Sequence, residues 1–384
     1  MTEPSPRDGG RIVPALPRES IIVVTFAAIL GSALAVREFS GIVAPVLLAL
    51  VLVIAVQPLR DAVVRRGLPA WAATLVQLVA VYAIVVGFWL SLVVVGARFA
   101  ALLGSYEPQF EDFIDNLGEE LEKLGVGADQ VHSLLGSLDL GKLVGIATNL
   151  IGGVAGMLSS IFFIVILLFF AATDAGTFAR RLTALPEGGT RMAQACGIFA
   201  QGTRSYLGVS TVFGLAVALV DVGMLYALDI RDPWLWGLLA FLTNYIPNVG
   251  FIIGLVPPSI IALLDHGVGD AVAVVAGYSI INFVLQTLVQ PRVVGVAVGL
   301  SGSVSFLSLV VWTAILGGAG AILAVPLTIF VKAMLVDVNP DRQWVGGLLS
   351  GGDPAPRTRG RRDRRKKTRD SERASEPAEQ EGSA

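Results

Sequence analysis

Apolar residues run along this chain in long blocks, and polar residues gather between the blocks rather than alternating within them. A membrane-spanning helix needs about 20 mostly apolar residues, because the hydrocarbon core of a bilayer is about 30 Å thick. Blocks near or above this length lie at Ile21–Val36, Gly41–Val56, Trp71–Val95, Ile146–Ala172, Ser205–Leu228, Trp234–Leu264, Ala271–Val289 and Val304–Val336. The pattern predicts an all-α polytopic integral membrane protein with about eight membrane segments.

Two blocks in the C-terminal half are too long for a single upright span. As one helix, Trp234–Leu264 would be about 46 Å long at roughly 1.5 Å per residue. Proline removes a backbone donor and glycine weakens a helix, so both favour an interruption. Such residues in the two blocks are Pro247, Gly250, Gly254, Pro257, Pro258, Gly317, Gly318, Gly320 and Pro326. We expect either strongly tilted spans or broken, re-entrant helices here.

The first interruption, centred on Pro247, lies between Asn244 and Asn248. A helix break at membrane depth frees backbone groups, which must meet polar partners because hydrocarbon offers none. In secondary transporters, paired interruptions of this kind mark the binding site. We therefore expect Asn244–Gly254 to line a substrate or ion path together with the glycine-rich break at Gly317–Gly320.

Three amides recur at four-residue intervals in the segment that follows the first over-long block. Asn282, Gln286 and Gln290 therefore share one helical face. Such amides in membrane helices most often bond to neighbouring helices. The alternative is that they form a polar wall of the transport path beside the broken helix.

One carboxylate, Asp221, lies inside the apolar block Ser205–Leu228. A charge at this depth is costly and suggests an ion or proton site. The competing interpretation is a structural acid that is paired or reaches interfacial water, because Asp229 lies only about two turns away.

Three stretches resemble the autoinducer-2 exporter (AI-2E) family of bacterial permeases. They are Asn244–Pro258, then Gln290-Pro-Arg-Val-Val-Gly295 through Leu300-Ser301, and finally Gly317-Gly-Ala-Gly-Ala-Ile-Leu-Ala-Val-Pro326. Their order and spacing also fit, and the resemblance covers Ile21 to Val336. It implies export of a signalling molecule such as autoinducer-2, and it also allows exchange of a monovalent cation for protons.

Charged residues divide the chain into membrane and extramembrane parts. Residues 1–20 form a basic N-terminal tail, 21–97 hold N-terminal membrane helices, 146–337 form a C-terminal membrane core, and 338–384 form a disordered, strongly basic tail. Because basic loops stay in the cytoplasm, both ends are expected there, in the inner (plasma) membrane. The C-terminal tail is expected to contact anionic lipid rather than nucleic acid.

Residues 98–145 form an acidic extramembrane segment, which we expect outside the cell. Apolar residues at three- and four-residue spacing predict one amphipathic helix: Phe110, Phe113, Ile114, Leu117, Leu121 and Leu124. This stripe packs either on the membrane domain or on a second copy of the chain, and we expect a homo-oligomer. A lid that captures substrate is the sharper alternative.

Composition removes most other classes of function. The chain is 54% hydrophobic and 15% charged, with a mean hydropathy of +0.73, whereas a soluble domain has about 25% charged residues. It has one cysteine and two widely separated histidines, so no disulfide, metal site or cofactor is predicted. No phosphate-binding loop or nucleophile motif is present, which argues against an ATP-driven pump or an enzyme. We expect a secondary transporter that exports a small polar molecule. The alternatives are a monovalent cation/proton antiporter and a membrane scaffold that does not transport.

Overall fold

The structure is a computed structural model that describes residues 18–106, 187–290 and 300–339, with isolated residues between 108 and 170 and at 346. All regular elements in these ranges are helices, which confirms the all-α prediction. Six of the helices are long and apolar enough to cross a membrane, and two shorter apolar helices accompany them. The chain is therefore a multi-pass membrane protein. The predicted span Ile146–Ala172, most of the acidic segment and most of the basic tail fall outside the described residues.

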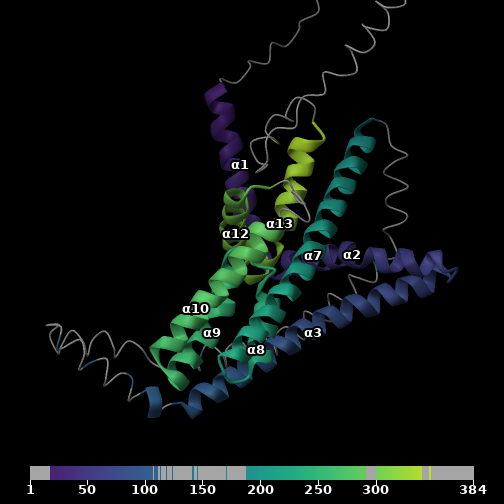
Figure 1. The fold of residues 1–384 in the computed structure, drawn as a ribbon. Helices are drawn as coiled ribbons and strands as arrows, with labels where there is room; N and C mark the ends of the chain where they lie inside the picture. The colour runs from purple at the N-terminus through teal and green to yellow at the C-terminus, as the bar shows by residue number, and fades with distance from the viewer. Residues whose placement is uncertain are drawn as a thin grey trace, which may run out of the picture.

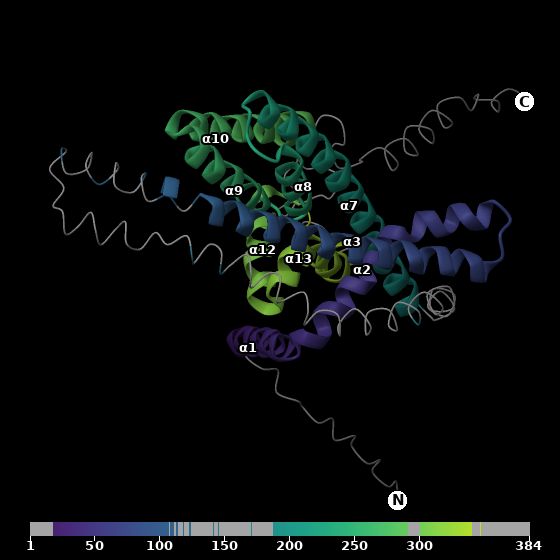
Figure 2. The same cartoon turned by 90° about the horizontal axis from the view of Figure 1, so that it is seen from below.

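The end of the α2–α3 pair that carries their connecting turn projects from the molecule, whereas the remainder of the N-terminal helices packs on α7, α8, α12 and α13 (Figures 1 and 2). Helix α1 (Arg18–Glu38) meets α2 (Ser40–Arg65) at Phe39, and α2 leaves it at a steep angle. A short turn containing Gly67, with φ +83°, then leads into α3 (Ala70–Ser105), which packs against α2. Buried Gln77 donates its Nε2 hydrogen to the carbonyl of Val53, 3.0 Å away. This amide ties two membrane helices together, as most such amides do.

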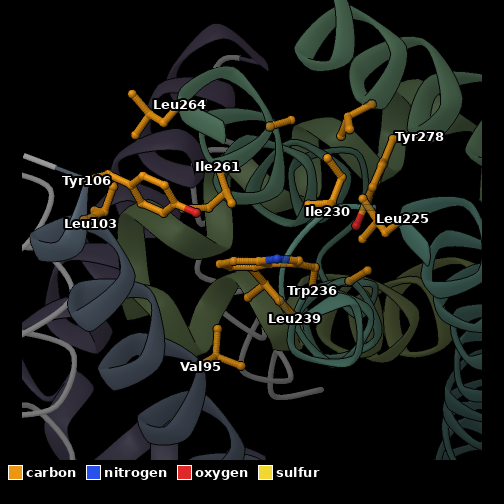
Figure 3. Close-up of a cluster of buried hydrophobic side chains, with 13 residues drawn as sticks. Val95, Leu103, Tyr106, Leu225, Ile230, Trp236, Leu239, Ile261, Leu264 and Tyr278 are labelled. Atoms are coloured by element: carbon orange, nitrogen blue, oxygen red, sulfur yellow. The ribbon is translucent and has the colours of Figure 1, made fainter. Parts of the chain in front are cut away.

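Helix α7 (Glu187–Ala227) is the longest of the described elements and packs against both parts of the C-terminal half. It is followed by α8 (Pro233–Thr243), α9 (Val249–His266), α10 (Val268–Asn282) and a π-helical continuation, η1 (Phe283–Val289). Trp236 lies in the middle of the apolar cluster that joins α3, α7, α8, α9 and α10 (Figure 3). Its indole donates to the Arg231 carbonyl at 2.8 Å, which fixes the turn between α7 and α8.

Each over-long block folds as a helical hairpin rather than as one tilted span. The first gives α8 and α9, and the second gives α12 (Gly302–Leu316), α13 (Gly318–Lys332) and the short π-helix η2 (Ala333–Asp337). At 11 residues α8 is about 16 Å long, and at 15 residues α12 is about 22 Å long, so neither crosses a 30 Å core by itself. The second arm of each hairpin, α9 or α13 with η2, is long and apolar enough to cross.

The two hairpins close in the same way. Each turns at a residue with positive φ: Asn248 at +62° in the first and Gly317 at +64° in the second. Soon after each turn a glycine passes against a carbonyl of the preceding arm, Gly250 against Thr243 and Gly320 against Trp312, so closely that a Cβ would overlap the oxygen. The prolines behave differently from the prediction, because Pro257, Pro258 and Pro326 lie inside α9 and α13 without ending them. In a packed membrane helix, neighbours and local adjustments accommodate the lost bond.

Candidate functional site

The break between α8 and α9 is held by a side-chain amide rather than by the proline alone. Asn244, the C-cap residue directly after α8, donates its Nδ2 hydrogen to the carbonyl of Ser210 on α7, 2.8 Å away. Gly214, also on α7, faces the same amide, and a Cβ at that position would collide with it. The Asn244 side chain is therefore fitted into the surface of α7.

Gln286 connects this break to the helix that follows it. Its Nε2 donates to the Oδ1 of Asn244 at 3.0 Å and to the Oδ1 of Asn282 at 2.7 Å. Gln286 lies in η1, whose wider π-helical turns begin directly after Asn282. Stretches of π-helix are rare in proteins, and those that occur often lie at functional sites. We call Asn244, Asn282 and Gln286 the amide network.

The backbone of the break is already satisfied to a large extent by the protein itself. The carbonyl of Tyr245 accepts a hydrogen bond from the Tyr206 hydroxyl at 3.1 Å, and the Tyr245 hydroxyl lies 2.8 Å from the hydroxyl of Thr211. The amides of Ile246 and Gly250 bond to the carbonyls of Thr243 and Ile246 at 2.9 Å each. The polar groups left to meet a substrate are therefore side chains, more than freed backbone groups.

A small cavity lies beside the amide network, where α7, α8, α9 and α10 meet. Its volume is about 10 Å³, room for about one water molecule. The lining residues are Val217, Asp221, Ala240, Asn244, Gly250, Phe251, Gly254, Tyr278 and Asn282. Asp221 is 0% exposed, and neither of its carboxylate oxygens has a hydrogen-bond partner within residues 18–106, 187–290 and 300–339. The Tyr278 hydroxyl is likewise buried and without a partner.

The cavity gathers five of the predicted site residues, Asp221, Asn244, Gly250, Gly254 and Asn282, and Gln286 bonds to two of them. The other predicted residues lie elsewhere. Pro247 forms the turn, Asn248 is exposed, Pro257 lies farther along α9, and Gln290 follows the end of η1.

The second hairpin reaches the site through apolar contacts. Ile246 and Val249, in and directly after the break, pack against Leu309, Ala321 and Ala324 of α12 and α13. Gly317, Gly318, Gly320 and Pro326 shape that hairpin and do not line the cavity. The two interruptions are thus neighbours in space, joined by packing around the break.

Sequence reasoning missed Tyr278 and Gly214. Tyr278 precedes Asn282 by four residues and so extends the amide face by one turn, a signal that the i, i+4 spacing carries. Gly214 gives no comparable signal, because its role depends on the Asn244 side chain of another helix.

A second group of polar residues lies where α3 and α9 end beside the turn between α7 and α8. Arg231 lies 3.8 Å from the carboxylate of Asp265 and stacks over the ring of Tyr106, with 5.3 Å from its guanidinium carbon to the ring centre. Burial, with the Asp265 carboxylate nearby, raises the pKa of the Tyr106 phenol, so this hydroxyl keeps its proton. A larger depression of about 370 Å³ borders this point, lined in part by Arg231, Asp265 and His266.

Comparison with known proteins gives consistent matches over nearly the whole membrane region. A family model described as "AI-2E family transporter" matches residues 20–339. The "AI-2 transport protein TqsA" of Escherichia coli is 33% identical over 323 residues, which cover 82% of this chain and 91% of that protein. A Haemophilus influenzae protein named "Putative transport protein" is 29% identical over 315 residues, covering 80% of this chain and 90% of that protein.

Proposed function

This chain belongs to the AI-2E family of transporters, and from that premise we propose that it exports a small polar molecule of the autoinducer-2 type. The observation that carries the proposal is the amide network at the helix break, in a chain that is 33% identical to the E. coli AI-2 transport protein. A side-chain amide offers both donors and acceptors. Three of them together suit a solute rich in hydroxyl groups, which needs both.

The conformation described here is closed to such a solute. A cavity of about 10 Å³ is far below the roughly 300–1,000 Å³ of ordinary small-molecule sites. Binding therefore requires the α8–α9 hairpin to separate from η1, which breaks the hydrogen bond between Gln286 and Asn244. The solute would then replace that bond with its own hydroxyl groups, so the amides are satisfied in both states.

Several further properties are part of the proposal. The chain lies in the inner membrane with both termini in the cytoplasm, as its basic flanks indicate. The basic C-terminal tail contacts anionic lipid. The acidic segment at residues 98–145 mediates contacts between copies of the chain. Transport is driven by a gradient rather than by ATP.

Transport by the purified full chain in proteoliposomes tests the proposal. Vesicles loaded with labelled autoinducer-2 should release it faster than vesicles without protein, and the Gln286→Ala variant should release it more slowly than the wild type. Equal release with and without wild-type protein that is folded and inserted would refute transport of this solute. It would favour the membrane scaffold instead.

A further inference from the structure

We propose that the cavity beside Asp221 is a site for one desolvated monovalent cation, either a proton or Na⁺, whose binding is coupled to opening of the break. This inference rests on the proposed function, because the gradient of the bound cation would drive the proposed export. Its starting point is the pair Asp221 and Tyr278. Both line the cavity, both are at most 1% exposed, and their terminal oxygens have no hydrogen-bond partners among the described residues.

In the part of the chain that the structure describes, no basic side chain lies beside Asp221 in the cavity. Among the described residues, the cavity lining has only Asp221 and Tyr278 as titratable groups. The other described titratable side chains on the helices that line it stay outside that lining: Arg191, Cys196, Arg204, Tyr206, Tyr226, Asp265, His266 and Asp270. A buried carboxylate without hydrogen bonds or a counter-charge is strongly unfavourable in an apolar medium. A cation bound in the cavity removes this cost.

The lining suits a cation of this size. The cavity has room for about one water molecule, and its lining includes Asp221 and Tyr278, whose terminal oxygens are unpaired, beside Asn244 and Asn282. Oxygen atoms of this kind are the ligands of hard cations. A proton needs less space, because it binds directly to a carboxylate oxygen and leaves room for a water molecule beside the phenol.

Asn244 and Asn282 belong to the cavity and to the amide network alike. Separation of the α8–α9 hairpin from η1 displaces Asn244, so it opens the cavity to water at the same time as it exposes the amides. Asp221 then exchanges its cation with solvent. The α8–α9 hairpin therefore prefers one position when the cation is bound and another when the site is empty. Coupling requires this difference in the affinity of the cation for the two positions.

Thermal unfolding of the purified full chain in detergent tests the site directly. In a choline chloride buffer at about pH 8, replacement of choline by Na⁺ should raise the Tm of the wild type by about 2–4 °C if Na⁺ is the cation. If the cation is a proton, the folded protein holds a proton that the unfolded chain releases, so stability rises as the pH falls. The Tm in choline buffer should then rise from about pH 8 to pH 6.

Asp221→Asn should abolish whichever response the wild type shows, because the amide is neutral and nearly the same shape. Asp270→Asn is the matched control, since it removes a half-exposed carboxylate of α10 outside the cavity and should keep the response. A wild type that responds to neither cation overturns the inference, even if Asp221→Asn does not fold. An Asp221→Asn variant that retains the full response also overturns it.

The same preparations separate this inference from the proposed function. Wild-type protein that carries autoinducer-2 but shows neither Tm response contradicts the cation site alone. A response that depends on Asp221, in protein that does not carry autoinducer-2, contradicts the proposed substrate and supports the cation site in an exchanger of cations for protons.

Discussion

Gln286 and Asn244 are 42 residues apart in the chain and are joined by a 3.0 Å hydrogen bond between their side chains. The bond links the π-helical η1 to the break between α8 and α9. It also orients Asn244, whose other side-chain atom is held by Ser210 on α7. Three elements thus meet at one amide, and any movement of the first hairpin must change its hydrogen bonds.

We expect Gln286→Ala to slow transport more than it lowers stability. The change leaves the Oδ1 atoms of Asn244 and Asn282 without their donor, at a cost of about 1–3 kcal/mol if no water enters. Release of autoinducer-2 from proteoliposomes should fall severalfold. Gln290→Ala is the control, because Gln290 lies outside the amide network. Equal loss of transport in both variants would contradict a specific role for Gln286.

The second hairpin provides a matched pair of glycines for a test of its geometry. A Cβ at Gly320 would overlap the carbonyl of Trp312, whereas a Cβ at Gly318 would meet nothing within 4 Å. Gly320→Ala should therefore destabilise the protein by about 3 kcal/mol or more, as backbone must move. Gly318→Ala should be neutral or slightly stabilising. Tm in detergent compares the two, and similar values would refute this account of the hairpin.

Asn248 tests whether the break needs a side chain or a backbone conformation. Its φ is +62°, its side chain is exposed, and it does not line the cavity. Asn248→Gly should preserve stability and transport, because glycine adopts this conformation freely. Asn248→Ala should cost about 1–2 kcal/mol of stability through backbone strain. If Asn248→Gly folds normally but loses transport, the amide itself contributes to the path.

The topology predicted from the basic flanks can be measured by labelling. In a Cys196→Ala background, which has no other cysteine, single cysteines at Asp115 and Arg364 should react with membrane-impermeant reagent from opposite sides. The Asp115 position should be accessible in intact cells and the Arg364 position only after lysis. Reaction of both from the same side would reject the proposed orientation.

The acidic segment is expected to hold copies of the chain together. Deletion of Gln109–Leu124 removes the predicted apolar stripe and should reduce the size of the assembly in detergent. Light scattering coupled to gel filtration gives the mass of each species. An assembly of unchanged mass, in protein that still inserts, would place the contacts elsewhere.

The hydrophobic pattern predicted the helical membrane fold well, because a long apolar block has few alternatives in a bilayer. It also placed the first interruption near Asn244–Asn248, since proline and asparagine together disfavour a continuous helix. It did not show that Pro257 and Pro326 would stay inside helices, because tertiary neighbours decide that outcome. The meeting of Asp221 with Tyr278 depends on how α7 and α10 pack, which no local pattern encodes.

Helix α7 connects the cavity to the second hairpin. It is one continuous element of 41 residues, with Asp221 near one end and Gly202, which contacts Ile329 of the second hairpin, farther along. From Asp221 to Glu187 the axis measures about 50 Å at roughly 1.5 Å per residue. The cavity and the second hairpin thus contact one continuous helix, so a displacement of α7 at either place would reach the other along its axis.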